Sequence, residues 1–126
     1  WVVRAAWPGE GRMPESCVFC KIGSGEIPSE VLYRDDLALA IRDINPRAPT
    51  HLLVVPLEHV TYLSPLPHDR EPLVGHLLLV AGEMARREGL VDGGYRLVVN
   101  QGSNAGQGVP HLHVHVLGGR RLGDMG

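Results

Sequence analysis

The chain has no excess of basic charge and no long apolar run. With 12 Lys and Arg against 14 Asp and Glu, its formal net charge is −2, so no basic field indicates binding to nucleic acid or to an anionic membrane. No apolar run approaches the roughly 20 residues that a membrane-spanning helix needs. The opening residues also lack the sustained apolar core of a secretory signal. We therefore expect a cytoplasmic protein that binds neither nucleic acid nor membrane.

Cysteine is scarce, and the length is short. The two cysteines, Cys17 and Cys20, form a Cys-x-x-Cys pair, which without a secretory signal favours a metal site or a redox pair over a structural disulfide. The 126 residues suffice for one domain with a substantial core but not for two. Because Met13 resembles a natural start, residues 1–12 are predicted to be an upstream or vector-derived extension, and residues 13–126 a single domain.

The pattern of apolar residues predicts an α+β fold. Alternating or near-continuous apolar stretches predict five strands, at residues 31–34, 37–43, 51–56, 94–99 and 111–117. Between the third and fourth strands, apolar residues recur at helical spacing, with Asp69 as the N-cap and Gly89 as the C-terminal stop. This order of elements favours a mostly antiparallel five-stranded sheet with one long helix across a face.

The last predicted strand, His111-Leu-His-Val-His-Val-Leu117, is the most informative segment. It holds three of the seven histidines. Alternate side chains of a strand point to the same face, so His111, His113 and His115 line one face while the aliphatic residues between them pack into the core. Three imidazoles on one rigid strand favour catalysis or metal binding. The alternative is a hydrated strand face that carries histidine without a function.

A glycine-rich loop from Asn100 to Gly108 leads directly into the histidine strand. Its glycines permit backbone conformations that direct N–H groups toward an anion. Loops of this kind are usually only turns. Next to the imidazoles, however, this one indicates a phosphate held beside a nucleophile or an acid.

These motifs resemble the histidine-triad (HIT) superfamily, and most closely its Hint branch, whose members resemble purine nucleoside phosphoramidases. The resemblance extends in order from about residue 15 to 120. Besides the histidine strand it includes Cys17-Val-Phe-Cys-Lys-Ile, Glu26-Ile-Pro-Ser, Asp43-Ile-Asn-Pro, Ala48-Pro-Thr-His-Leu-Leu-Val-Val-Pro56, His59 and Tyr95-Arg-Leu-Val-Val-Asn100.

The resemblance implies a nucleotide hydrolase that cleaves the phosphorus–nitrogen bond, or a related bond, of nucleoside 5′-phosphoramidates or adenylates. His113 would attack the α-phosphorus and form a covalent nucleotidyl-histidine, which water hydrolyses to the nucleoside monophosphate. We expect a backbone carbonyl to hold its other ring nitrogen. His115 would bind phosphate oxygens, and His51 would support the pocket. No cofactor takes part in the chemistry.

The resemblance also implies contacts to the purine nucleotide. Asp43 would bind the ribose hydroxyls, although an ordinary turn residue after a strand is the alternative. An apolar slot for the purine would be formed by Ile44, Leu39 and Leu52.

Around the phosphate, the resemblance implies that Asn100 and Gln107 face the phosphate or the leaving group. Hint proteins commonly have Ser or Thr after this Gln, where the present chain has Gly108. A hydroxyl is therefore missing, and only the backbone N–H remains to bind the phosphate or leaving group.

Within the resemblance, Cys17, Cys20, His59 and His111 are the candidate ligands of a structural zinc. Thiolate sulfur and neutral imidazole nitrogen are the donors that zinc prefers in closed tetrahedral sites. Free cysteines and an ordinary loop histidine are the alternative. The resemblance further implies a homodimer that pairs the long helices, through the apolar face between Val74 and Met84, and joins the sheet edges. Periodicity alone leaves open whether this apolar stripe packs against its own sheet or against a second subunit.

Other functions stay open at this point. One is a dinucleoside-polyphosphate hydrolase or a nucleotidyl transferase of the same superfamily. Another is a protein in which His111, His113 and His115 together bind a metal, since His-x-His on a strand can form a three-histidine zinc site. The last is a nucleotide-binding sensor without turnover.

Overall fold

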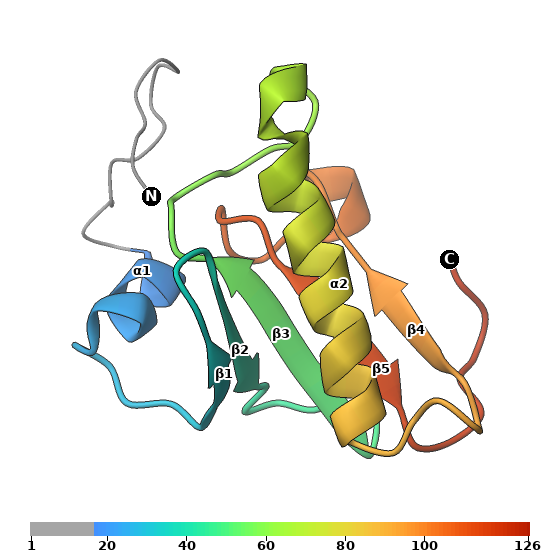
Figure 1. Ribbon diagram of the computed structural model, residues 1–126. Helices are drawn as coiled ribbons and strands as arrows, with labels where there is room; N and C mark the ends of the chain where they lie inside the picture. The colour runs from blue at the N-terminus through green and yellow to red at the C-terminus, as the bar shows by residue number, and fades with distance from the viewer. Residues whose placement is uncertain (1–16) are drawn as a thin grey trace.

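The computed structural model describes residues 17–126, so the predicted extension at residues 1–12 lies outside the described residues. Figure 1 shows how the elements are arranged. In chain order they are α1 (Val18–Ser24), β1 (Val31–Arg34), β2 (Ala38–Arg42), β3 (Thr50–Pro56), the 3₁₀ turn η1 (His68–Arg70), α2 (Glu71–Arg87), β4 (Tyr95–Val98), the 3₁₀ turn η2 (Ser103–Ala105) and β5 (Val114–Gly118).

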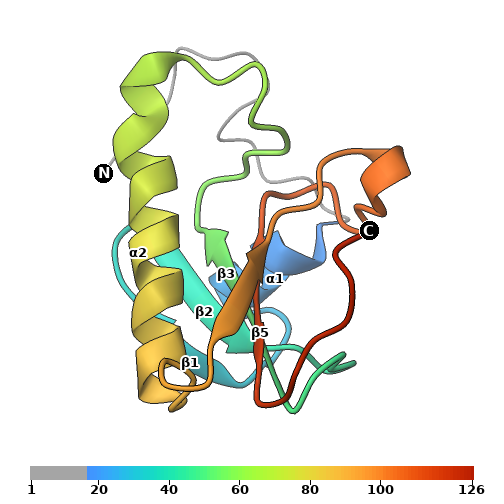
Figure 2. The ribbon, with the colours of Figure 1, turned by 90° about the vertical axis from the view of Figure 1, so that its right-hand side faces the viewer.

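The strands form one five-stranded sheet in the order β1-β2-β3-β5-β4, and every neighbouring pair is antiparallel. Helix α2 lies across one face of this sheet, and α1 lies toward the other (Figure 2). The predicted α+β class, with an antiparallel sheet and one long helix, is confirmed. None of the helices within residues 17–126 is long and apolar enough to span a membrane.

Strands β2 and β3 are almost continuously apolar because both of their faces are covered. Ala38, Ala40, Leu52 and Val54 belong to the core beneath α2. The side chains between them point to the other face, where Leu39, Ile41, Leu53 and Val55 pack with Phe19 and Cys20. Strand side chains alternate between the two faces. Helix α2 covers the first face, so a site can form only on the second face, where α1 leaves part of the sheet uncovered.

Helix α2 follows the predicted stripe, but its start differs from the prediction. Its buried residues are those that recur at helical spacing, Leu73, Leu77, Val80, Ala81, Met84 and Ala85. Gly89 follows the helix with a φ of 74°, as expected for its C-terminal stop. The predicted N-cap is wrong: Asp69 lies inside η1, and Arg70 precedes α2 without a side-chain cap. Pro72 in the first turn has no N–H, so one fewer donor needs a cap there.

The histidine strand is shorter than predicted. β5 begins at Val114, so His111 and His113 lie in the segment that leads into it, where the Leu112 N–H donates to the Val60 carbonyl. The predicted alternation still holds, because Leu112, Val114 and Val116 belong to the core beneath α2.

Candidate functional site

A cleft of about 740 Å³ opens on the face of the sheet opposite α2, a size typical of small-molecule sites. Its lining includes the predicted site residues His51, His113, His115, Asp43, Ile44, Asn100 and Gly108. These residues come from three separate segments: the end of β2 with the following loop, the start of β3, and the β4–β5 loop with β5. The sheet order brings the segments together, because β3 pairs with both β2 and β5.

His113 presents one ring nitrogen to the cleft and has the other one fixed. Its Nδ1 lies 2.7 Å from the backbone carbonyl oxygen of His111. A carbonyl only accepts, so Nδ1 carries the proton and donates it, and Nε2 of the neutral ring keeps its lone pair. The expected backbone acceptor is thereby confirmed. The edge of the Phe19 ring packs against His113, with centroids 5.1 Å apart, and limits rotation of the imidazole.

His115 has the opposite arrangement, set by a chain of hydrogen bonds. The Arg47 N–H donates to Nδ1 of His51 over 3.0 Å, so neutral His51 carries its proton on Nε2. That nitrogen lies 2.9 Å from Nδ1 of His115, which therefore accepts. Neutral His115 is left with its proton on Nε2. The cleft thus holds a lone-pair nitrogen on His113 and an N–H donor on His115.

Burial keeps His51 and His115 neutral. Burial and, to a smaller extent, the neighbouring His113 and His51 lower the pKa of His115 to about 4, against an opposing effect of Asp43. Burial also lowers the pKa of His51, again opposed by Asp43. Both rings are consequently uncharged near pH 7, which is the state that the hydrogen-bond chain requires.

Asp43, His51 and His115 lie close enough to one another to form a possible metal site. The Asp43 Oδ2 atom is 3.4 Å from Nε2 of His51. However, the Arg47 N–H occupies Nδ1 of His51 and leaves the proton on Nε2, the nitrogen that faces the other two groups. A protonated ring nitrogen cannot be a ligand. The arrangement therefore favours a hydrogen-bonded chain over a cation site.

The structure does not support a metal held jointly by the three strand histidines. Within residues 17–126, the groups whose ligand atoms converge place His111 with the cysteines and His115 with Asp43 and His51, and His113 is in neither group. The hydrogen bonds explain the separation, because Nδ1 of His111 faces Cys17 while Nδ1 of His113 donates to the His111 carbonyl.

Gln107 does not lie where the resemblance implied. Its side-chain oxygen accepts from the Gly102 N–H over 2.8 Å, and its amide donates to the Thr61 carbonyl. It is absent from the lining of the cleft, whereas Asn100 and Gly106 belong to that lining. Gln107 thus closes the β4–β5 loop internally.

The prediction of the apolar lining of the cleft was partly wrong. Ile44 lies at its edge, but Leu52 is fully buried beneath α2 and Leu39 in the core of the other face. The slot is lined instead by residues that the sequence analysis missed, Phe19, Ile22, Ile27, Ile41 and Leu53. The signal was the helical spacing of Phe19 and Ile22 ahead of Gly25, which ends α1 with a φ of 89°.

The predicted zinc ligands converge at a second, buried centre. Cys17 Sγ is 3.3 Å from Nδ1 of His111, and Cys20 Sγ is 3.3 Å from Nδ1 of His59 and 3.5 Å from Nδ1 of His111. A tetrahedral zinc with ordinary bond lengths would separate sulfur and nitrogen ligands by about 3.5 Å. All four residues are buried, so the donor set and its spacing fit a closed structural site.

The surroundings of the two ligand histidines direct the correct nitrogens inward. His111 donates from Nε2 to the Pro56 carbonyl over 2.9 Å. His59 has Nε2 at 3.2 Å from the Thr61 hydroxyl, which in turn donates to the Pro110 carbonyl. Both rings therefore keep a lone pair on Nδ1, the atom that faces the cysteines. Outer hydrogen bonds of this kind orient histidines toward a metal.

Burial disfavours the charged forms of Cys20, His59 and His111. Burial and, to a smaller extent, the neighbouring Cys17 raise the pKa of the Cys20 thiol to about 12. Burial likewise lowers the pKa of His111 to about 4 and that of His59 below its usual value. A bound metal would displace the thiol protons, because thiolate is the ligand form of cysteine.

Comparison with known proteins agrees with the fold. A HIT domain model matches residues 24–122, and the chain belongs to this family. The purine nucleoside phosphoramidase of Escherichia coli K12 is 43% identical over 113 residues, which cover 90% of this chain and 95% of that protein.

Solved structures show the same architecture. A HIT family hydrolase from Legionella pneumophila superposes with a TM-score of 0.82 at 47% identity, covering 84% of this chain and 95% of that one. A histidine triad protein from Clostridium difficile gives 0.84 at 42% identity, covering 90% and 98%. The chain is therefore a HIT-family hydrolase.

Proposed function

We propose that this protein hydrolyses nucleoside 5′-phosphoramidates and related adenylates through a covalent nucleotidyl-His113 intermediate. The observation that carries the proposal is the opposite protonation of two neighbouring rings. His113 offers a lone pair at Nε2, because Nδ1 donates to the His111 carbonyl. His115 offers an N–H, because its Nδ1 accepts from His51. A nucleophile and a proton donor are thus available at neutral pH without a change of tautomer.

In the first step, Nε2 of His113 attacks the α-phosphorus and the phosphorus–nitrogen bond breaks. The departing amine takes the proton from Nε2 of His115. Loss of this proton leaves a negative charge on the hydrogen-bonded pair of His115 and His51. The positive charge on the nucleotidylated His113 ring offsets it. In the second step water attacks phosphorus, the bond to His113 breaks, and the proton released by water restores His115. The products are a nucleoside monophosphate and an amine.

The cleft also suits the remainder of a purine nucleotide. Ile44 is 87% exposed at the edge of the apolar slot, and an aromatic base would cover this side chain. Asp43 lines the same cleft beside His51, and its carboxylate can accept from ribose hydroxyls there. The Escherichia coli relative, which is named purine nucleoside phosphoramidase, supports the proposed chemistry.

A substrate panel tests the proposal. The protein is incubated with adenosine 5′-phosphoramidate, a dinucleoside polyphosphate and an acyl-adenylate, and release of AMP is measured. We expect the phosphoramidate to give the highest kcat/KM, and His113→Ala to lower it by at least about 10³-fold. His68→Ala is the matched control, because this side chain is 97% exposed. Faster cleavage of the polyphosphate would favour the related hydrolases, and tight AMP binding without turnover would favour a sensor.

We also propose that Cys17, Cys20, His59 and His111 hold a structural zinc. The metal would connect the N-terminal segment before α1 to the segment that carries His113, and would take no part in the reaction. The fit of the four ligand atoms supports this assignment.

We further propose a homodimer formed through α2 and the sheet edge. Leu78 and Leu79 on the outer side of α2 are 45% and 76% exposed, and Tyr95 on edge strand β4 is 39% exposed. Pairing with a second copy would remove these apolar side chains from water. Light scattering at micromolar concentration is expected to give twice the chain mass, and a single-chain mass would contradict the proposal.

A further inference from the structure

The segment that follows β5 packs directly against the loop between β2 and β3. Gly119 has a φ of 98°, a conformation that residues with a Cβ rarely adopt. A Cβ built on Gly119 would also lie only 2.9 Å from the Cβ of Pro49, which is closer than such atoms can approach. Both the backbone conformation and the contact with Pro49 therefore require glycine here. As a result, the next residue, Arg120, lies beside the β2–β3 loop.

The guanidinium of Arg120 connects two backbone carbonyls. One of its nitrogens donates to the Arg47 carbonyl on the β2–β3 loop over 3.0 Å, and the other donates to the Arg121 carbonyl over 2.9 Å. Hydrogen bonds from a charged donor are stronger than neutral ones, and the planar guanidinium fixes their directions. Arg120 thus holds the backbone of Arg47 from outside the loop.

The backbone of Arg47 also determines the protonation of the cleft histidines. Its N–H donates to Nδ1 of His51 over 3.0 Å, and Nε2 of His51 lies 2.9 Å from Nδ1 of His115. Residues 44–47 are exposed, so packing alone holds this part of the loop weakly. If the loop moved away, Nδ1 of His51 would lose its donor, and the proton of His51 could occupy either ring nitrogen.

We propose that Arg120 is a positioning residue for the reaction. By holding the Arg47 backbone in place, it keeps the proton of His115 on Nε2, the nitrogen that donates to the leaving group. Its own side chain acts only through the loop. This inference rests on the proposed function, since it assumes that His115 protonates a departing amine.

Two substrates that differ in their need for an acid test the proposal. Adenosine 5′-phosphoramidate releases an amine, which needs a proton to leave phosphorus, whereas an acyl-adenylate releases a carboxylate, which needs none. Both substrates carry the same adenosine, so changes in nucleoside binding cancel in the ratio of their kcat/KM values. This ratio, phosphoramidate over acyl-adenylate, is measured for the unmodified protein and for Arg120→Gln, after subtraction of the rates without protein.

We expect Arg120→Gln to lower the ratio by about tenfold, which is part of the roughly 10²–10⁴-fold that a positioned acid contributes. The kcat/KM for the acyl-adenylate should change by less than about threefold, because its leaving group does not depend on His115. Since Arg120 is exposed, the Tm should fall by no more than about 2 °C. That small change would show that the variant is folded.

Arg121→Gln is the matched control. Arg121 is the exposed neighbour of Arg120 in the chain, and it contributes its backbone carbonyl to the contact. The substitution keeps that carbonyl and removes a positive charge from the same segment. It should therefore leave the ratio unchanged.

Nitrogen NMR of the histidine rings measures the tautomer directly, without substrate. The unmodified protein should show His115 protonated on Nε2 alone, and Arg120→Gln should show a mixture of the two tautomers. A single, unchanged tautomer in this variant would overturn the role of Arg120 even if the protein cleaved no substrate.

An unchanged ratio in Arg120→Gln, or an equal loss of rate on both substrates, would also overturn that role and would leave the proposed function intact. If the unmodified protein released AMP from neither substrate, the proposed function itself would fail.

Discussion

The backbone N–H of Arg47 determines which nitrogen of His51 carries a proton, and through it the tautomer of His115. Geometry fixes which ring nitrogen carries each proton, because an N–H donor can only face a lone pair. Arg47 N–H, His51 and His115 form a continuous chain with distances of 3.0 and 2.9 Å. In the proposed mechanism, His51 therefore positions His115 and does not need to touch the substrate.

Removing His51 should lower kcat more than it raises KM. In His51→Ala, Nδ1 of His115 has no donor, so the ring can adopt either tautomer and loses its orientation. We expect kcat to fall at least about tenfold, since tautomer control is costly to lose, with KM changed by less than about threefold. Steady-state kinetics on the phosphoramidate give both values. A variant with normal kcat and a raised KM would instead indicate a role in binding.

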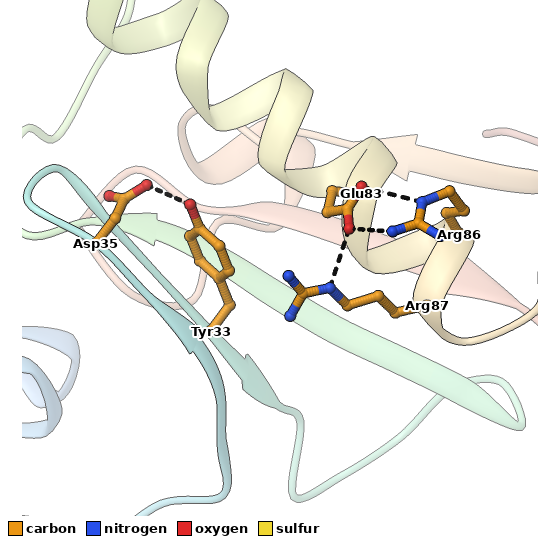
Figure 3. A network of polar contacts seen from close by, with 5 residues as sticks. All are labelled: Tyr33, Asp35, Glu83, Arg86 and Arg87. Atoms are coloured by element: carbon orange, nitrogen blue, oxygen red, sulfur yellow. Dashed lines mark hydrogen bonds and ion pairs between the residues drawn. The ribbon is translucent and has the colours of Figure 1, made fainter.

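At the scale of elements, Asp35 connects the β1–β2 hairpin to α2. Its carboxylate accepts from the Leu37 and Ala38 N–H groups of the turn, from the Tyr33 hydroxyl and from the ring of His76 on α2. Figure 3 shows the Tyr33–Asp35 bond and, on the last turn of α2, Glu83 between Arg86 and Arg87. The Arg87 guanidinium lies 5.5 Å from the centre of the Tyr33 ring, a second contact between hairpin and helix.

Asp35→Asn should destabilise the protein at neutral pH but not in strong acid. Burial alone would raise the pKa of Asp35, but the hydrogen bonds to it prevail and lower the pKa from 3.8 to about 2. Its stabilising effect is therefore complete above about pH 4 and is lost as the pH falls toward 2. We expect a Tm lower by about 4 °C or more at pH 7, and a difference that shrinks below pH 3.

The control for this prediction is Asp36→Asn, because Asp36 is the exposed neighbour in the same turn. It should change Tm little at any pH. If the Asp35 variant kept an equal deficit at pH 7 and pH 2, its effect would not arise from the ionised carboxylate.

Local patterns in the sequence were enough to predict most of the helices and strands. They were not enough to predict which residues line the cleft. The buried stripe of α2 and the hairpin bounds follow from periodicity and turn residues. α1 was missed because its short apolar pattern, around Phe19 and Ile22, is ambiguous without the sheet it covers. Leu52 was misplaced because adjacency in sequence to His51 does not reveal that its side chain points to the face beneath α2. Leu39 lies on the face of the cleft, but it is fully buried in the core that includes Phe19 and Cys20.

At the scale of the whole molecule, the cluster of Cys17, Cys20, His59 and His111 and the cleft share one segment. His111 belongs to the cluster, and its carbonyl accepts from Nδ1 of His113. The Cys17 side chain also caps α1 by accepting from the Cys20 N–H. A zinc here would therefore fix α1, which lines the apolar slot, and the catalytic segment relative to each other.

Elemental analysis of the purified protein should find about one zinc per chain. Cys17→Ser and Cys20→Ser should each lose the metal and lower the Tm, because structural zinc contributes directly to folding. His113→Ala should keep the metal. Loss of zinc from the His113 variant, with retention in both cysteine variants, would contradict the assignment and restore the three-histidine site.

The covalent bond between His113 and phosphorus is the central claim, and a rapid-quench experiment coupled to mass spectrometry tests it most directly. The protein is mixed with excess adenosine 5′-phosphoramidate, stopped with base within milliseconds to seconds and digested, and the peptide with residues 111–117 is sequenced. The proposed mechanism predicts an AMP adduct on His113 that forms and decays at rates compatible with kcat. Rapid release of AMP with no adduct on any histidine, or with an adduct on another residue, would contradict it.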